Sequence, residues 1–285
     1  MSIDASQLKT SGVYASQTPL GTLLSDLAEI EQICRKWRGY RKTVGWTGAL
    51  LLLAGLAFLI VLNDFPALVV AGIACLVAAV VCIIAAFRFA RNPLRHTDRC
   101  ATARAIAETL RDDTHPKSPV TVRMSLGDQA RTLLKQQEWS ARRKGQQKFF
   151  ADEWLTIENA FLDGSVMTES VTDLVRQRSY VNARGKSKSK TRTHHVVAMR
   201  FKYPEDLYGD PGRLPEGARQ LVKTPSTAAV RGVEIRPGQL KLKATVSSSK
   251  DLIATSKMLQ LGVYRILNLS RKIAAHSRAA EGGSR

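Results

Sequence analysis

A run of basic residues at alternate positions is the feature of this 285-residue chain whose spacing most clearly suggests a chemical role. The segment between Leu174 and Pro204 contains no acidic residue, and all of its basic residues lie at even positions. Side chains of an extended chain alternate between two faces, so residues spaced in this way project to one side until a turn breaks the register. The pattern predicts an anion-binding ribbon of nine residues: Arg176, Arg178, Arg184, Lys186, Lys188, Lys190, Arg192, Arg200 and Lys202.

Three interpretations of this ribbon are open. Lysine residues on an exposed sheet edge discourage aggregation between sheets, a role that needs no ligand. Basic side chains also bind anionic lipid, with a contribution of about 1 kcal/mol from each one near the membrane surface. The third interpretation is a nucleotide or a nucleic acid. Base stacking needs aromatic faces, and Tyr180 is the only one between Arg176 and Arg192, so a small anionic ligand is favoured over a polynucleotide.

The rest of the sequence lacks the motifs of common catalytic sites. It contains no phosphate-binding loop, dinucleotide-binding glycine pattern, zinc protease motif, serine hydrolase motif or kinase motif. The sequence Gly185-Lys186-Ser187 resembles the end of a Walker loop, but Tyr180 occupies the position of the first glycine. We therefore expect a non-enzymatic protein without a cofactor.

Metal binding is not indicated either. The five histidines and four cysteines show none of the spacings typical of metal ligands. His194 and His195 are adjacent in a predicted strand and would point to opposite faces. Asp163 and Asp173 are better explained by turns and caps than by acid–base chemistry. We expect neither a metal site nor a disulfide.

Two apolar stretches, residues 44–62 and 67–87, precede the ribbon, and neither contains a charged side chain. As a helix, each would be about 28–31 Å long, which matches a bilayer hydrocarbon core of about 30 Å. Helices also satisfy their backbone N–H and C=O groups internally, as lipid requires. The link Asn63–Pro66 is too short for anything but an antiparallel turn. The pattern predicts a transmembrane hairpin.

Basic residues flank this hairpin on both sides. Five precede the first span and four follow the second, whereas the turn between the spans carries only Asp64. The positive-inside rule then predicts that both termini are cytoplasmic, in a two-span protein of a bacterial inner membrane. The flanking residues are Arg35, Lys36, Arg38, Arg41, Lys42, Arg88, Arg91, Arg95 and Arg99.

Small residues recur at intervals of four along the second span, at Ala67, Ala71, Cys75 and Ala79. A stripe of small residues lets helices approach closely in lipid. The stripe is open to interpretation as the internal seam of the hairpin, as a contact between protomers, or as general alanine richness.

The remaining pattern predicts an α+β domain on the cytoplasmic side. Period-two alternation predicts strands at 154–162, 165–183 and 190–203 within an antiparallel sheet of five or six strands. Helical segments at 126–150 and from Lys250 onward would cover one face. The expected order is a disordered N-terminus (1–17), an amphipathic helix (18–43), the two spans (44–62 and 67–87), a helical connector (88–114), the α+β domain (115–278) and a flexible tail (279–285).

The formal net charge of +19 favours anionic partners. Our leading hypothesis is a membrane-anchored, non-enzymatic protein, an oligomer or a scaffold subunit of a membrane assembly. Its basic β domain would engage anionic headgroups of the inner leaflet or an acidic protein surface. The alternative is a ligand-gated membrane effector, in which a nucleotide-like signal bound by the β domain drives oligomerisation and membrane disruption. This architecture resembles the two-span effectors with a β domain in bacterial anti-phage signalling, and the resemblance implies such a ligand.

Overall fold

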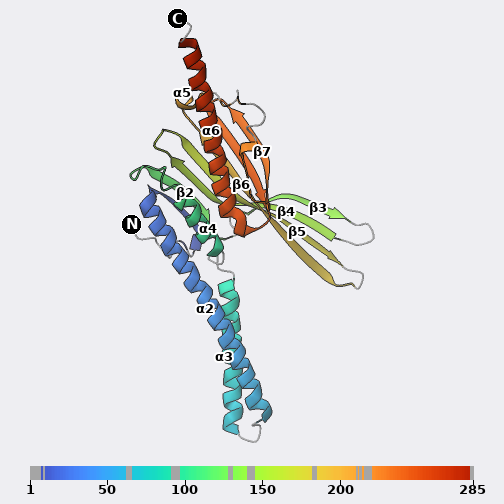
Figure 1. Ribbon diagram of the computed structural model, residues 1–285. Coiled ribbons are helices and arrows are strands. Elements are labelled where there is room, and N and C mark those ends of the chain that lie inside the picture. The colour runs from blue at the N-terminus through green and yellow to red at the C-terminus, as the bar shows by residue number, and fades with distance from the viewer. Residues whose placement is uncertain are drawn as a thin grey trace.

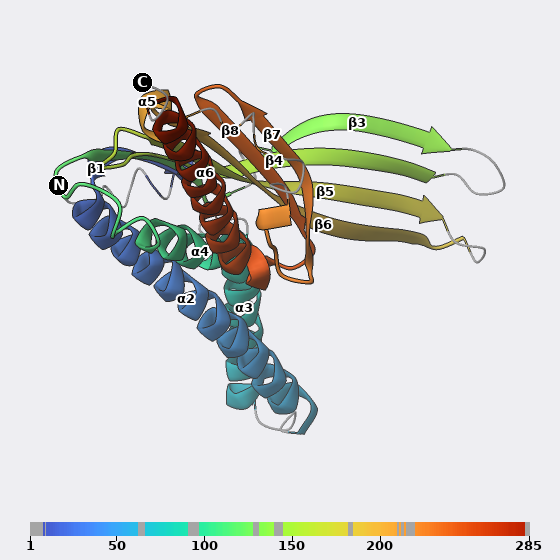
Figure 2. The same ribbon diagram turned by 45° about the horizontal axis from the view of Figure 1, so that its top comes forward.

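The computed structural model describes residues 8, 10–61, 66–90, 97–127, 131–139, 145–181, 185–209, 211, 214 and 220–282. In this part of the chain, two long apolar helices form a hairpin, and an open antiparallel sheet of eight strands packs against helices (Figure 1). The hairpin leaves the sheet and its helices at one end, and one part of the sheet projects sideways (Figure 2).

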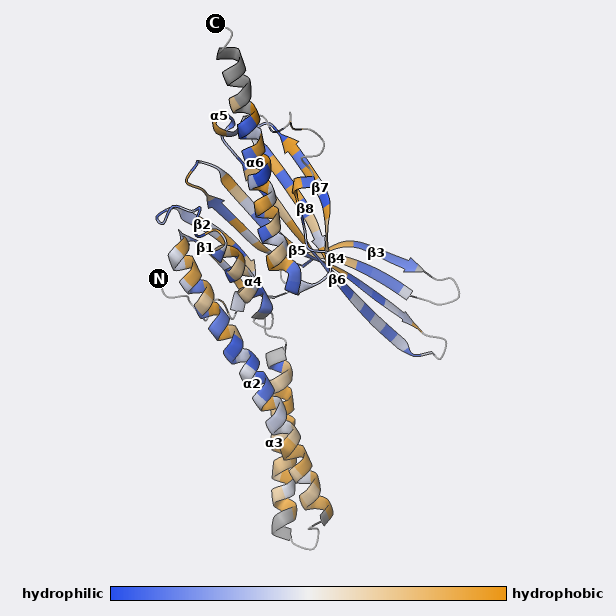
Figure 3. Cartoon of the chain, viewed as in Figure 1, coloured by the Kyte–Doolittle hydropathy of each residue, from blue (hydrophilic) through white to orange (hydrophobic). Residues whose placement is uncertain are grey.

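The hairpin consists of α2, Leu20–Val61, and α3, Pro66–Ala90. Both helices are long and apolar enough to cross a membrane, and Figure 3 shows that their shared part is largely hydrophobic. Their apolar side chains are mostly exposed, for example Leu53 and Val77. No proline interrupts the chain between Leu20 and the second apolar stretch, so α2 continues unbroken into the first.

Glycines bring the two helices of the hairpin into close contact. A Cβ atom at Gly55 would lie 2.9 Å from Cγ of Leu76 and 3.0 Å from the carbonyl oxygen of Gly72. A Cβ atom at Gly72 would in turn lie 3.2 Å from Cβ of Phe58. The backbones approach this closely only because both positions lack a side chain.

The sheet is antiparallel throughout, with the strand order β1-β2-β4-β5-β6-β8-β7, and β3 pairs with the free part of β4. The three central strands, β4 to β6, have 16 residues each. The strands are β1 Val13–Pro19, β2 Pro119–Ser125, β3 Arg131–Trp139, β4 Gly145–Ala160, β5 Val166–Val181, β6 Ser187–Lys202, β7 Ala228–Arg236 and β8 Gln239–Val246.

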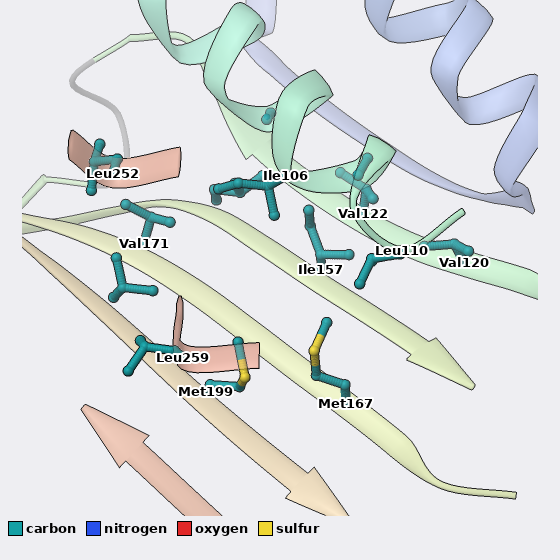
Figure 4. Packing of buried hydrophobic residues seen from close by; sticks show 14 of the residues in the cluster. Ile106, Leu110, Val120, Val122, Ile157, Met167, Val171, Met199, Leu252 and Leu259 are labelled. Carbon is teal, nitrogen blue, oxygen red and sulfur yellow. The ribbon is translucent and has the colours of Figure 1, made fainter. Parts of the chain in front are cut away.

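The hydrophobic core lies between one face of this sheet and three helices. These are α4 (Thr97–Glu108), α6 (Leu252–Gly282) and the first half of α2. Figure 4 shows Ile106 of α4 and Leu259 of α6 gathered with Ile157 and Met199 of the sheet. Two short helices, α5 (Glu205–Tyr208) and the 3-10 helix η4 (Ser249–Asp251), complete the described elements.

The core includes segments from both sides of the hairpin. Leu23, Leu27 and Ile30 of α2 are fully buried in it, as are Ala103 and Ile106 of α4. The apolar positions of α2 recur at helical spacing and pack against protein. The sheet domain is therefore not a separate C-terminal segment, because residues before position 115 supply part of its core.

The number of strands predicted from sequence, five or six, is wrong. One additional strand is β1, where residues 13–17 were predicted to be disordered. This strand pairs along its whole length with β2, which satisfies the backbone groups of a segment with few apolar side chains.

The helix predicted at 126–150 is also wrong, because this region contains β3 and the first part of β4. Its Gln, Lys, Glu and Arg residues favour helix in isolation. Pairing of β4 with β5 from Gly145 to Ala160 overrides that preference, and β3 then pairs along β4. Helical cover of the sheet comes from α2, α4 and α6 instead.

Candidate functional site

Parts of four strands extend beyond the helices and form a projecting arm. We define the arm as residues 131–139 of β3, 145–152 of β4, 174–181 of β5 and 187–194 of β6. Figure 2 shows these strand segments projecting to one side of the molecule, away from α2, α4 and α6. The arm is largely hydrophilic (Figure 3). Strand pairing from β3 through β6 holds it as a continuous extension of the sheet.

The arm carries most of the predicted basic ribbon. Arg176 and Arg178 lie on β5, and Lys188, Lys190 and Arg192 lie on β6. Lys186 lies just before β6, and Arg184 lies outside the described residues.

The strand register places four of these residues directly opposite one another. Arg176 is paired with Arg192, and Arg178 is paired with Lys190. These four side chains, which we call the cation cluster, are exposed and line a shallow hollow of about 140 Å³. Paired positions of antiparallel strands project to the same face, so the cation cluster is a single surface.

The same face of the arm carries two further cations, Lys135 and Lys188, and no carboxylate among its described residues. Phe149 and Gln147 of β4 lie opposite Arg176 and Arg178, and Lys135 of β3 lies opposite Phe149. Like charges placed directly opposite are destabilising by about 0.2–1 kcal/mol per pair. An anion bound over the cation cluster would remove that cost.

Two neutral contacts orient the arginines of the cation cluster. The Arg176 guanidinium donates a hydrogen bond to Oε1 of Gln147 at 3.1 Å. The Arg178 guanidinium carbon lies 5.4 Å from the ring centroid of Tyr180. Neither partner carries a charge, so both contacts position guanidinium groups without neutralising them.

Arg200 and Lys202 are separated from the cation cluster, although the sequence placed them in the same ribbon. They lie at the other end of β6, where the sheet is backed by helices. Eight residues of strand between Arg192 and Arg200 span about 26 Å. One small anion cannot contact both groups, so the ribbon consists of two separate basic regions.

A buried polar network lies where the arm joins the sheet. The guanidinium of Arg99, on α4, donates to Asp152 of β4 at 2.6 Å and to Asp173 of β5 at 2.9 Å. It also donates to the carbonyl oxygens of Ser125 and Gly127, at 3.1 Å each. The guanidinium carbon lies 5.3 Å from the ring centroid of Trp154.

Asp173 is the central acceptor of this network. Besides Arg99, its carboxylate accepts from Nε1 of Trp154 at 3.1 Å and lies 2.7 Å from Nδ1 of His195. Burial alone would raise the pKa of the Asp173 carboxyl, but the hydrogen bond from His195 and the charge of Arg99 together hold it below its ordinary value. Asp173 is therefore a half-buried carboxylate paired with cationic and polar groups.

Sequence reasoning missed this network. Asp173 was assigned to a turn or cap, and this is wrong because it lies within β5. Asp163 does support the turn after β4, where it accepts from the backbone N–H of Ser165. Arg99 was assigned to the basic flank of the hairpin, whereas the structure buries it. Its carboxylate partners are 53 and 74 residues away in sequence, and no local pattern signals that contact.

The predicted stripe of small residues is divided in the structure. Ala79 is fully buried, and its carbonyl oxygen lies 3.6 Å from where a Cβ atom of Gly48 would stand, so it belongs to the seam between α2 and α3. Ala71 and Cys75 are half-buried beside the seam. The side chain of Ala67 lies outside the described residues.

Comparison with known proteins returned no relative. No model of a protein family matches the chain, and no curated protein and no solved structure matches it either.

Proposed function

We propose that this protein is a non-enzymatic, membrane-anchored protein whose arm binds anionic lipid headgroups of the leaflet next to its cytoplasmic domain. The single observation that carries the proposal is the cation cluster, in which four basic side chains face one another on a surface without a carboxylate among its described residues. At about 1 kcal/mol for each basic residue near an anionic surface, the four together would contribute about 4 kcal/mol.

The proposed anchor is supported by the residues at one end of the apolar part of the hairpin. Trp46 is 72% exposed and Tyr40 is 59% exposed on α2. Trp46 lines a shallow hollow together with Arg38, Arg41 and Lys42. Aromatic rings next to basic residues are typical of a membrane–water interface. This level of the hairpin is where the bilayer surface would lie.

The direction of the arm fits the same proposal. In Figure 1 the arm projects sideways, and its β5–β6 end points toward the side of the domain from which the hairpin leaves. With the hairpin in the bilayer, the arm would extend over the adjacent leaflet. The same charge would also suit an acidic protein subunit, which is one outcome of the test below.

The test uses the full-length protein in nanodiscs with an environment-sensitive fluorophore on the arm. The label is attached at Ser189→Cys, an exposed position of β6. We expect its emission to shift in nanodiscs that contain phosphatidylglycerol and not in pure phosphatidylcholine. Salt should weaken the shift.

The cation cluster is tested by replacing its four members with glutamine. The matched control removes four exposed charges from η4 and α6: Lys250, Lys257, Arg265 and Arg271. The shift should be lost only in the first variant. Equal emission in both lipids, or an equal loss of the shift in both variants, contradicts lipid binding by the arm. If an acidic protein co-purifies with the full-length protein through the arm, that protein would be the partner instead of lipid.

A ligand-gated membrane effector is the second candidate function. The observation that favours it is a hollow of about 450 Å³ on the sheet face opposite the helices. Oligomerisation of hairpins after ligand binding would disrupt the bilayer. Expression of the full-length protein should then depolarise cells. A variant in the seam between α2 and α3, such as Gly55→Val, should reduce this depolarisation. If the variant depolarises cells as strongly as the unchanged protein, this function is contradicted.

A further inference from the structure

A hollow of about 450 Å³ lies on the outer face of the sheet, and it is separate from the cation cluster. Residues of five strands line it, from β4 across β5, β6 and β8 to β7. Its volume falls within the range of small-molecule sites, about 300–1,000 Å³. The cation cluster, at about 140 Å³, has room for little more than a single anionic group.

The hollow exists because a row of small residues crosses the sheet. Ser170 of β5 lies opposite Ala198 of β6, and Thr156 of β4 lies opposite Ser170. At the far side of the row, Gly232 follows a register shift in β7, and a Cβ atom there would meet nothing within 4 Å. Lys243 of β8 lies in this row, between Ala198 and Gly232. Longer side chains, among them Arg200 and Lys241, stand along one side of the row. The small residues therefore form a floor beside these charged groups.

The neighbouring row and Lys243 supply positive charge. Arg200 of β6 lies directly opposite Lys241 of β8, and Lys243 stands two positions further along β8. Lys241 pairs with Glu234 at 3.6 Å. Within the described residues, no ion pair involves Arg200 or Lys243. The hollow therefore offers two cations that form no ion pair with another described residue.

Hydroxyl groups and two carboxylates, those of Glu153 and Glu234, complete the lining. Thr168 lies opposite Arg200, and Ser170 is its neighbour on the same face of β5. Glu153 lines the β4 side, where it accepts a hydrogen bond from Thr156 at 3.1 Å. An arginine with a lysine suits a phosphate, and the carboxylates and hydroxyls suit ligand hydroxyl groups.

From this arrangement we infer that the hollow binds a small, soluble phosphorylated molecule that also carries hydroxyl groups, no larger than a mononucleotide. Its phosphate would lie between Arg200 and Lys243, and its body would rest on the floor of Ser170, Ala198 and Gly232. The inference gives the second candidate function a ligand site, but it concerns binding alone and stands whether or not binding opens the membrane.

The test measures the melting temperature of the full-length protein in mild detergent at constant ionic strength. The probes are AMP, ribose 5-phosphate and inorganic phosphate, each at ~10 mM. A ligand at ten times its dissociation constant raises the melting temperature of a domain of this size by about 3–6 °C. We expect a shift of this order with AMP or ribose 5-phosphate, and a smaller one with inorganic phosphate.

Three variants locate the site. Arg200→Gln should abolish the shift by removing a phosphate contact. Gly232→Leu should abolish it because the leucine side chain would fill the hollow without clashing with neighbouring residues. Arg176→Gln, in the cation cluster, should retain it. Each variant is first melted without ligand, which identifies any that fails to fold.

No shift with any of the three probes overturns the inference. A shift that persists in both Arg200→Gln and Gly232→Leu also overturns it. The same is true if short-chain phosphatidylglycerol produces a shift in melting temperature and the soluble probes do not. A null result here leaves the nanodisc test of the arm unaffected, because Arg200 and Gly232 lie outside the arm.

Discussion

Glu169 gives the sharpest test of how the core of this protein is built. It lies on the inner face of β5, fully buried beneath α6. Nε2 of Gln260 donates to its Oε2 at 3.3 Å, while its Oε1 has no hydrogen-bond partner. Burial raises the pKa of the Glu169 carboxyl, and the hydrogen bonds from Ser256 and Gln260 offset this only in part.

The substitution Glu169→Gln should therefore stabilise the protein, increasingly so as pH rises. A carboxyl whose pKa is raised by folding contributes stability that is complete below its unfolded value, near 4.5, and is lost as pH rises through the folded value. Over that interval the free energy of unfolding falls by about 1.4 kcal/mol per pH unit. Glutamine keeps the shape of the side chain and cannot ionise, so the variant escapes this loss.

The measurement is the melting temperature of the full-length protein and the variant in mild detergent between pH 4.5 and 8. At about 2–4 °C per kcal/mol, the two curves should separate by about 3–6 °C per pH unit, with the variant higher, until the folded pKa is reached. A variant that melts lower at every pH, or a separation that does not depend on pH, would refute a buried neutral carboxyl at Glu169.

Asp173→Asn is the matched control, because Asp173 lies four residues further along the same face of β5. Its pKa is lowered in the folded state, so it contributes stability that is present above its unfolded value, near 3.8, and is lost as pH falls through the folded value. Removing the charge that Arg99 contacts should cost about 2 kcal/mol at neutral pH. This deficit should shrink toward pH 3, opposite to the trend for Glu169→Gln.

Two further predictions concern the hairpin and its link to the sheet. Gly55→Val should lower the melting temperature, because its Cβ would lie 2.9 Å from Cγ of Leu76. Gly45→Val is the control and should not lower it, because nothing lies within 4 Å of a Cβ there. Equal effects of the two substitutions would contradict the seam between α2 and α3. Sγ of Cys34 lies 3.6 Å from Sγ of Cys100 in the buried contact between α2 and α4. Both thiols should resist maleimide in the folded protein. Oxidation with copper phenanthroline should link them within one chain, as peptide mass spectrometry would show. Rapid maleimide labelling of Cys34 in the folded protein would contradict this contact.

The sequence predicted the parts of the structure that depend on short-range patterns. Hydropathy alone identifies the two apolar helices. Alternation identifies β5 and β6, and the even positions of the basic residues place them on one face. The pairing of Arg176 with Arg192 could not be predicted, because it depends on the register between β5 and β6, which alternation alone does not give.

The rest of the structure depends on contacts between distant segments. The strand β3 is stabilised by pairing with β4, although its own residues favour helix. The hollow on the outer face requires small residues from four strands to meet in one row, and only the assembled sheet shows that. The contacts of Arg99 with Asp152 and Asp173 likewise appear only in the assembled fold, because the sequence pattern assigned its charge to the flank of the hairpin.

Arg99 is also where the two proposed functional parts of the molecule meet. It lies near the start of α4, the first described helix after the hairpin, and α4 packs against α2 through the Cys34–Cys100 contact. Its guanidinium binds Asp152 and Asp173, which lie on β4 and β5 at the base of the arm. A buried cation with two carboxylates tolerates little displacement, since each lost contact leaves a charge without a partner in the interior. Together with the packing of α2 and α4 against the sheet, this network holds the arm in one orientation relative to the hairpin. An arm held in this way can meet the membrane surface without the entropic cost of ordering a flexible segment.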